Sequence, residues 1–286
     1  MTVVPAAGRL LELARAYPLE GFERSFKVST HRLLTERFLF GIQRARLRTQ
    51  MVADFCRGLG IPPVFLSAAM RAIPSADTLH FGYEGQGKGA FCKLYLEFWR
   101  RLNDSQSSLF REESVPLYLA FKWDPDDPQR QALARYTCYP WADAATMKRR
   151  LTALYGGGSA RCPSWAFVQE LLDSLTQAGK AAPMYIEVRE DGCPRRSFDL
   201  NLHDLDLPMT SLAVPTLRLA NAFGLAGGAL EGLLGALGNL PVGHVSGGTG
   251  RDGDDFLTVY YRDSDPFGPQ NLQARTAEPR ASGGAG

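Results

Sequence analysis

The sequence predicts an α+β protein built from repeated α-β-β units, with a mostly antiparallel sheet and helices on one face of the sheet. Three observations predict this fold class. Stretches rich in aromatic and branched residues occur in pairs joined by turn-rich segments, as in β-hairpins. Segments with helical periodicity separate these pairs. Residues 62–98 and 224–262 share one order of helix, His-containing strand, Gly-rich turn and aromatic strand, so that His80 corresponds to His244.

The repeat leaves two architectures open. The unit recurs about four times along the chain, and successive hairpins with helices between them favour an antiparallel sheet. Such a sheet either curls toward a barrel whose interior holds a ligand, or stays an ordinary sheet with a packed core. We expect a single domain over residues 1–263 and a disordered tail over residues 264–286, which are rich in Pro, Gly, Ala and Ser.

The predicted elements follow in chain order. The first seventy residues have helical periodicity, with a short helix before Pro18 and a longer one from Thr35. A further helix begins at Pro62-Pro63 and ends before Pro74. Later helices are predicted within residues 143–155, 164–179 and 212–237. Four hairpins are predicted, with strands at residues 78–83 and 91–98, 116–123 and 133–139, 184–188 and 197–202, and 242–245 and 256–261.

Composition excludes several classes of partner. The 286 residues include 32 Lys+Arg and 30 Asp+Glu, a net charge of +2, which argues against a charge-driven nucleic-acid binder. No stretch reaches the ~18–20 uncharged apolar residues of a membrane helix, so we expect no membrane partner. The N-terminus lacks a signal-peptide pattern. Five cysteines without a CxxC pair predict reduced thiols and a cytoplasmic protein. Base rates predict a homodimer.

Phosphate-loop and metal motifs are also excluded. Residues 82–88 fit the GxxxxGK spacing, but Gly89 stands where Ser or Thr is needed, and a strand follows instead of a helix. The four histidines, His31, His80, His203 and His244, show no mutual spacing typical of a metal site. We therefore expect neither a metal nor a cofactor.

The strand at residues 91–98 carries the candidate chemistry. Alternation places Lys93, Tyr95 and Glu97 on one face, while Cys92 and its alternate neighbours form an apolar face. If the polar face is enclosed, burial raises the pKa of Glu97 and Lys93 lowers it, which suits a general acid/base. In the fourth hairpin, Arg262 corresponds to Glu97 and shares its face with Thr258 and Tyr260. If the sheet is open, the same face is solvated.

Aromatic residues on or beside these strands indicate the kind of ligand. A tyrosine-rich lining suits a flat aromatic molecule, although aromatic residues also favour strands for structural reasons. The residues concerned are Tyr83, Phe91, Tyr95, Trp123, Tyr136, Tyr139, Tyr260 and Tyr261.

Repeated α-β-β units with the Lys93-Leu-Tyr95 strand resemble the aromatic prenyltransferases of the αββα-barrel type. In that family, basic residues and tyrosines on successive inner strands hold an allylic diphosphate beside an aromatic acceptor. The resemblance implies this role for Lys93, Tyr95, Arg135-Tyr136 and the strand from Tyr260 to Arg262. The chain departs from the family by lacking a predicted fifth hairpin and by having few clearly inward basic residues.

The chain also resembles the microbial Pictet–Spengler enzymes that form β-carbolines from a tryptophan-like amine and a small aldehyde. The resemblance rests on the length and on the spacing of Arg71 ahead of Glu97. It implies a cofactor-independent enzyme in which Glu97 is the catalytic acid and base and Arg71 contacts the aldehyde partner. Lys93 and Tyr95 would tune Glu97 or orient the substrate, and His80 is a further candidate.

Three functions are therefore compared. The near-zero net charge argues against a cationic diphosphate site and favours the Pictet–Spengler cyclase, with an aromatic amine and an aldehyde as substrates. An aromatic prenyltransferase is the alternative. A non-catalytic small-molecule-binding protein with an open, solvated sheet face is the third.

Overall fold

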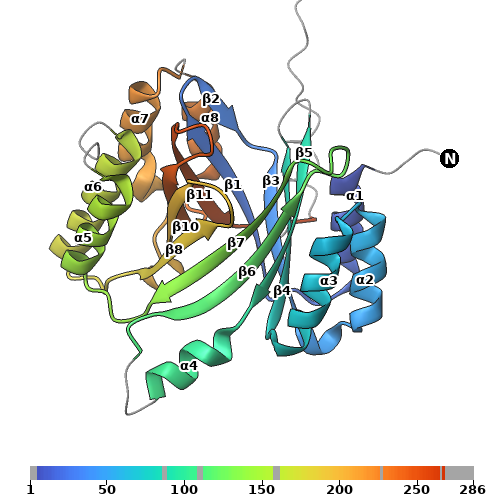
Figure 1. The fold of residues 1–286 in the computed structure, drawn as a ribbon. Helices are drawn as coiled ribbons and strands as arrows, with labels where there is room; N and C mark the ends of the chain where they lie inside the picture. Colours follow the sequence, from blue (N-terminus) through green and yellow to red (C-terminus); the bar gives the residue numbers. More distant parts are fainter. Residues whose placement is uncertain are drawn as a thin grey trace, which may run out of the picture.

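A closed antiparallel β-barrel forms the centre of the molecule (Figure 1). The computed structural model describes residues 5–85, 89–107, 112–156, 162–225, 228–264 and 266–267. Neighbouring strands pair in the order β11-β10-β9-β8-β7-β6-β5-β4-β3-β1, and β1 pairs with β11 to close the barrel. The short β2 pairs with the end of β1. The sheet is therefore curled and closed, which decides between the two predicted architectures.

The barrel strands are β1 (Gly21–Ser29), β3 (Arg37–Gln43), β4 (Thr78–Gly85), β5 (Ala90–Glu97), β6 (Val115–Trp123), β7 (Gln131–Tyr139), β8 (Met184–Glu190), β9 (Arg196–Asn201), β10 (Val242–Thr249) and β11 (Asp255–Arg262), with β2 (Arg32–Leu34) beside β1. The α-helices are α1 (Ala6–Ala16), α2 (Thr49–Gly58), α3 (Pro63–Ala72), α4 (Trp99–Ser107), α5 (Ala144–Tyr155), α6 (Pro163–Gln177), α7 (Ala213–Ala222) and α8 (Ala229–Leu237). Short 3-10 turns are η1 (Arg44–Arg46), η2 (Ile73–Ser75), η4 (His203–Leu205) and η5 (Met209–Leu212).

Helix and hairpin alternate five times in the described chain, not four as predicted. The missed unit is the first one, because residues 21–43 form β1 to β3 instead of helix. Phe38, Phe40 and Ile42 face outward and alternate with residues that face the interior, which is the period of a strand. Read at helical spacing, the same apolar residues had suggested a helix. The fifth hairpin of the prenyltransferase pattern is thus present.

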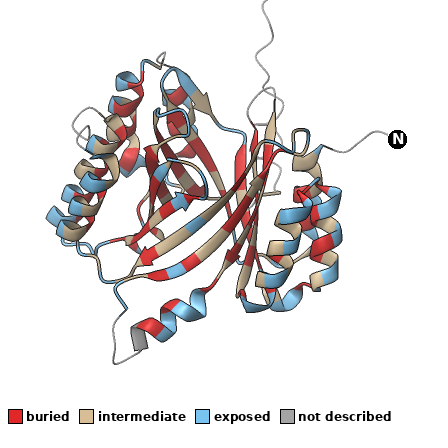
Figure 2. Cartoon of the chain, viewed as in Figure 1, coloured by how far each residue is buried: buried red, intermediate tan, exposed pale blue. Residues whose placement is uncertain are grey.

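The two largest apolar cores of the described residues lie outside the barrel, between its outer surface and the helices. In one, α1, α2 and α3 pack on β3 to β6, with Phe40, Phe81 and Phe121 at most 1% exposed. In the other, α5 to α8 pack on β8 to β11 and β1 around Phe26 and Phe198. Figure 2 shows buried residues on the helix sides that meet the barrel and exposed residues on the opposite sides. The strand faces that remain point into the barrel and carry most of its polar residues.

Several further predictions from the sequence can be compared with the structure. The apolar face of the predicted strand at residues 91–98 is confirmed, because Cys92, Leu94 and Leu96 are fully buried. None of the five cysteines, all of which lie in the described part of the chain, forms a disulfide. Among the described residues, no helix combines the length and the apolar character needed to span a membrane. Of the predicted tail, Phe267 packs edge-on against Phe22, and residues 265 and 268–286 lie outside the described residues.

This distribution of the core makes a testable prediction from two adjacent residues of β3. Phe40 is 1% exposed beneath the helices, whereas Leu39 faces the interior and borders a cavity. Phe40→Ala is expected to lower the free energy of unfolding by about 3–5 kcal/mol, the usual cost of removing a buried aromatic ring. Leu39→Ala should cost clearly less, since its side chain is only partly packed. Urea denaturation measures both values, and a larger loss for Leu39→Ala would contradict an outer core.

Candidate functional site

The barrel interior contains two adjoining polar spaces. The mouth cavity has a volume of about 830 Å³ and is bordered by Glu23, His80, Glu97, Tyr118, His203, His244 and Arg262, among others. The inner region is smaller and is lined by Lys27, Arg37, Glu84, Lys93, Lys122, Glu190 and Arg195, among others. Tyr95, Tyr136, Asp199 and Tyr260 border both spaces. The two spaces can therefore hold a charged group in the inner region and an aromatic molecule in the mouth cavity, in contact with each other.

Glu84 is the centre of a buried ion cluster in the inner region. Its carboxylate lies 2.6 Å from Arg37 Nη1, 2.7 Å from Lys93 Nζ and 3.2 Å from Lys122 Nζ. Burial opposes its ionisation, but Arg37, Lys122 and Lys93 hold the pKa of Glu84 well below its ordinary value. One carboxylate is thus shared by three basic side chains from β3, β5 and β6, although burial lowers the pKa of Lys122 well below its ordinary value.

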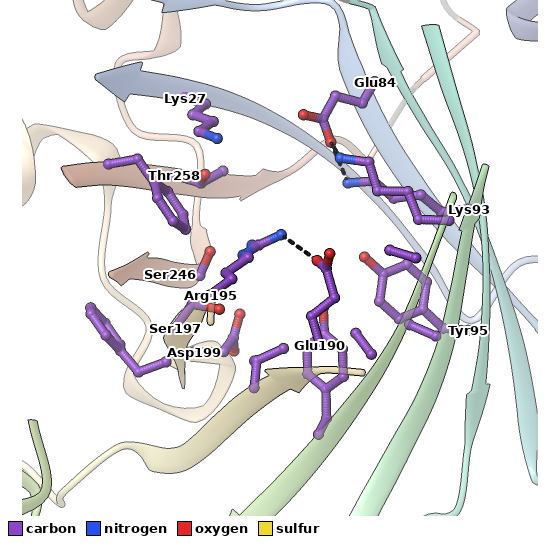
Figure 3. A pocket seen from close by; sticks show the side chains of 18 of the residues that line it. Lys27, Glu84, Lys93, Tyr95, Glu190, Arg195, Ser197, Asp199, Ser246 and Thr258 are labelled. Atoms are coloured by element: carbon purple, nitrogen blue, oxygen red, sulfur yellow. Dashed lines mark hydrogen bonds and ion pairs between the residues drawn. The ribbon is translucent and has the colours of Figure 1, made fainter. Parts of the chain in front are cut away.

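A second group of cations completes the inner region. Arg195 Nη1 lies 3.4 Å from Glu190, and Arg251 also pairs with Glu190. Lys27 projects from β1 with its Nζ 4.2 Å from the centre of the Phe256 ring. Burial lowers the pKa of Lys27 to about 8, with Glu84 opposing this and Arg37 adding to it. In Figure 3, the side chains of Lys27, Glu84, Lys93 and Arg195 point into one common space.

Basic side chains outnumber acidic ones in the inner region. Five of the described residues that line it are Lys or Arg, namely Lys27, Arg37, Lys93, Lys122 and Arg195, and three are Asp or Glu, namely Glu84, Glu190 and Asp199. The inference from net charge that a cationic site is absent is therefore wrong. Net charge sums the whole surface, and a value of +2 does not report how charge is distributed between interior and surface.

Tyrosine rings separate the inner region from the mouth cavity. The rings of Tyr95 and Tyr136 meet edge-on at 5.7 Å, and those of Tyr118 and Tyr136 do so at the same distance. Burial raises the pKa of Tyr95, Tyr118 and Tyr136, so these phenols stay neutral. The rings offer electron-rich faces to a cation and flat surfaces to an aromatic molecule.

Glu97 lies in the mouth cavity, beyond these rings. Its Oε2 is 3.0 Å from His80 Nε2. Burial opposes its ionisation, but His80, Tyr118 and Thr78 keep the pKa of Glu97 below its ordinary value, so it is a carboxylate at neutral pH. The prediction that Lys93 tunes Glu97 is wrong. Lys93 pairs with Glu84 instead, because Lys93 and Glu97 lie four residues apart on β5, which separates them by about 13–14 Å along the strand.

A second histidine-carboxylate group lies across the mouth cavity. His244 Nδ1 is 2.7 Å from Asp199 Oδ1, and Glu23 lies near both His244 and His203. Burial alone would lower the pKa of His244, yet Asp199 and Glu23 raise it to about 9. Of the residues that the structure describes, Glu23, His203 and His244 form the one group whose ligand atoms are close enough to hold a metal ion.

The structure places most of the predicted site residues in the interior. Lys93, Tyr95 and Glu97 follow one another along β5, and His80 lies on the neighbouring β4 beside Glu97. Tyr260 borders both spaces, and Arg262 lies at the mouth with its side chain 41% exposed. These placements agree with the predicted enclosed face, while the role of each residue stays a proposal.

Arg71 does not reach this site. It lies on α3, which packs Phe65 against Phe121 on the outer side of the barrel, and its guanidinium donates to Ser67 at 2.7 Å. The expectation that Arg71 contacts the aldehyde partner was based on its sequence spacing ahead of Glu97, and a helix outside the barrel does not present this exposed side chain to the interior.

Sequence reasoning missed several interior residues. Those on strands share one signal, which is a charged residue at an alternate position of a strand whose other face is apolar. Lys122 follows Tyr118 and Ala120 on one face of β6, and Arg37 precedes Leu39 on β3. The others are Glu23, Lys27, Glu84 and Glu190, together with Arg195 and His203 from the loops that flank β9.

No protein-family model matches the sequence, and no curated protein does either. Solved structures match the fold. The 5-dimethylallyl tryptophan synthase from Streptomyces coelicolor in complex with DMASPP and Trp gives a TM-score of 0.59 at 12% identity, over 84% of this chain and 78% of that one. The 6-dimethylallyltryptophan synthase from Micromonospora olivasterospora in complex with DMASPP and Trp gives 0.56 at 13%, over 85% and 82%. AnaPT from Neosartorya fischeri gives 0.52 at 14%, over 84% and 78%.

At these identities the likeness establishes a shared fold. It matches the resemblance to the αββα-barrel prenyltransferases, and it gives no support to the preferred resemblance to Pictet–Spengler enzymes.

The ion cluster around Glu84 makes the second prediction. Glu84→Gln leaves Arg37, Lys93 and Lys122 without their shared carboxylate, and we expect a loss of about 3–5 kcal/mol in the free energy of unfolding. Pyrophosphate should restore part of this loss, because an anion bound among the cations stabilises the folded state. Thermal unfolding with and without pyrophosphate measures both effects.

Glu187→Gln is the matched control. Glu187 pairs with Arg150 of α5 at 2.7 Å, on the outer side of β8. Glu187→Gln should lower the free energy of unfolding by less than Glu84→Gln does, and pyrophosphate should not restore this loss. Equal behaviour of the two variants would contradict an anion site in the inner region.

Proposed function

We propose that this chain is an aromatic prenyltransferase, which transfers an allylic group from an allylic diphosphate to an indolic acceptor. The observation that carries the proposal is the order of groups along one barrel interior. A region rich in basic side chains, a belt of tyrosines and a cavity with a partly buried carboxylate follow one another. The shared fold with structures named as dimethylallyltryptophan synthases, solved with DMASPP and Trp, supports the same function.

The cations of the inner region suit the diphosphate. Lys27, Lys93 and Arg195 face one space there, and charge-assisted hydrogen bonds from Lys and Arg to phosphate oxygens are short and strong. When the allylic C–O bond breaks, its electron pair leaves with the diphosphate. Positive side chains stabilise that departing charge and so lower the barrier to ionisation.

The tyrosine belt suits the allylic cation that remains. Tyr95, Tyr136 and Tyr260 border both the inner region and the mouth cavity, so their rings surround the path between the two substrates. Ring faces stabilise a nearby cation by roughly 0.5–2 kcal/mol each. The same rings exclude water, which would otherwise trap the cation as an alcohol.

Glu97 suits the acceptor. As a carboxylate held by His80, it accepts a hydrogen bond from an indole N–H and so favours attack by the ring on the allylic carbon. A new C–C bond then forms, and the ring carbon loses a proton to restore aromaticity. We assign this proton to the Glu97–His80 pair. The products are the prenylated indole, diphosphate and one proton.

The test is incubation of the purified protein with tryptophan and either dimethylallyl diphosphate or a small aldehyde, followed by mass spectrometry. A prenyl adduct is expected in the first mixture and no condensation product in the second. Glu97→Gln should lower kcat by about 10²–10⁴-fold, the range for loss of a general acid or base, and leave pyrophosphate affinity unchanged. Glu187→Gln, on the outer face, is the control that should keep full activity. A condensation product, or no product in either mixture, would refute the assignment.

Lys27 makes a pH prediction for the same site. With a pKa of about 8 in the free protein, Lys27 is charged below pH 8 and loses its proton above it. Since an anion binds the charged form, pyrophosphate affinity should fall by up to about tenfold per pH unit above pH 8. Lys27→Arg keeps the charge, so its profile should lack this decline, apart from the titration of pyrophosphate itself that both proteins share. Calorimetric titration with pyrophosphate from about pH 7 to about pH 9.5 measures the affinity of both proteins. Identical pH profiles for wild type and Lys27→Arg would contradict the role of Lys27.

A further inference from the structure

Three segments that are distant in sequence meet at one side of the mouth cavity. Glu23 comes from β1, His203 begins η4 just after β9, and His244 comes from β10. Both β1 and β10 pair with β11, so closure of the barrel brings Glu23 and His244 to the same end. His203 Nε2 lies 3.3 Å from Glu23 Oε1, and His244 Nε2 lies 3.9 Å from Glu23 Oε2. All three ligand atoms lie within 4.8 Å of one another.

The Glu23 carboxylate is buried with an unused oxygen. The residue is 7% exposed, and its Oε1 has no hydrogen bond of regular geometry, although His203 Nε2 lies 3.3 Å away. A buried carboxylate oxygen without a donor is costly unless something else supplies positive charge. This oxygen faces His203, and the other carboxylate oxygen faces His244.

The backbone of β10 leaves a cradle for this carboxylate. A Cβ at Gly243 would lie 1.7 Å from Glu23 Oε1 and 3.0 Å from the His203 ring, so only glycine leaves this space open. The pairing of β10 with β11 also shifts register between Val242 and His244. Such irregularities re-aim a side chain, here the imidazole of His244.

Asp199 holds the His244 ring in the orientation of a metal ligand. Its Oδ1 is 2.7 Å from Nδ1, which directs Nε2 toward Glu23. A carboxylate behind the far nitrogen of a histidine is the common support of metal-bound imidazoles. His203 is 30% exposed and lies at the start of a short turn, so it has room to close onto an ion.

From this arrangement we propose that Glu23, His203 and His244 bind a divalent transition-metal ion of the zinc class. Two imidazole nitrogens and one carboxylate suit Zn²⁺, Co²⁺ or Fe²⁺, whereas Mg²⁺ prefers an all-oxygen octahedron. Ligands about 2.1 Å from one tetrahedral ion lie about 3.4 Å apart. The separation of His203 Nε2 from Glu23 Oε1 is 3.3 Å, and that of His244 Nε2 from Glu23 Oε2 is 3.9 Å. The three residues border the mouth cavity, so the remaining position of the ion faces it.

The sequence-based expectation of no metal site is thereby revised. Positions 23, 203 and 244 share no motif spacing, and the grouping arises from barrel closure. The site also does not depend on the proposed prenyl transfer, since its test reads metal binding directly.

The experiment is titration of the full-length, chelator-treated protein with Co²⁺, read by visible absorption. Wild type is expected to develop the bands of tetrahedral or five-coordinate Co²⁺. Zn²⁺ should abolish these bands, and Mg²⁺ should leave them. Zn²⁺ should also raise the thermal midpoint of unfolding.

Variants test the assigned ligands. Loss of a supporting carboxylate lowers metal affinity by about 10–100-fold, and we expect this decrease for Asp199→Asn. His203→Ala and Glu23→Gln remove a ligand and should lower metal affinity by more. Gly243→Ala should weaken binding by displacing the carboxylate. His31→Asn is the matched control, because His31 lies on the surface beside Gly224 and asparagine tolerates its positive φ of 55°.

The outcomes are decisive in both directions. Bands that depend on His203 and not on His31 support the site. Absence of bands in wild type, displacement by Mg²⁺, or retention in folded His203→Ala, checked by circular dichroism, would overturn it. In that case His244 is only a protonated side chain between two carboxylates.

Discussion

Pairing between β1 and β11 is the interaction on which the rest of the structure depends. Seven residue pairs join the two strands, from Glu23 with Arg262 to Ser29 with Phe256. Without this ladder, the inner strand faces would form one side of an open sheet, and water would solvate their charges. With it, the alternate residues of ten strands enclose one another, and the apolar core moves to the space between barrel and helices. The polar interior is therefore a consequence of closure.

The order of helices and hairpins could be predicted because it depends on local pattern. Alternation placed Lys93, Tyr95 and Glu97 on one face, and the structure has them there. The hairpin at residues 21–43 was missed because adjacent apolar residues such as Phe38 and Leu39 also fit a helix. A period-two reading is decisive only when the alternate positions are plainly polar, and on β3 they include a leucine and a glycine.

The partners within the site could not be predicted, because they depend on register between strands. Lys93 and Lys122 are directly paired across β5 and β6, and both reach Glu84 of β4. Glu97 is paired with Thr78 in the strand ladder, yet its side chain contacts His80, which is the next inward-facing residue of β4. A shift of register by two residues would keep every face and exchange these partners. Sequence alone fixes the face of a strand residue much more readily than its neighbour on the next strand.

Strand β5 relates the two ends of the interior to each other. Its inward-facing residues are Lys93 in the ion cluster, Tyr95 in the tyrosine belt and Glu97 in the mouth cavity. Four residues of strand extend about 13–14 Å, so the cationic and carboxylate ends are held at a fixed separation by one rigid backbone. In the proposed reaction, this separation places the leaving diphosphate and the acceptor on opposite sides of Tyr95. The barrel thus supplies the relative orientation of two substrates, which is the part of catalysis that loops provide less precisely.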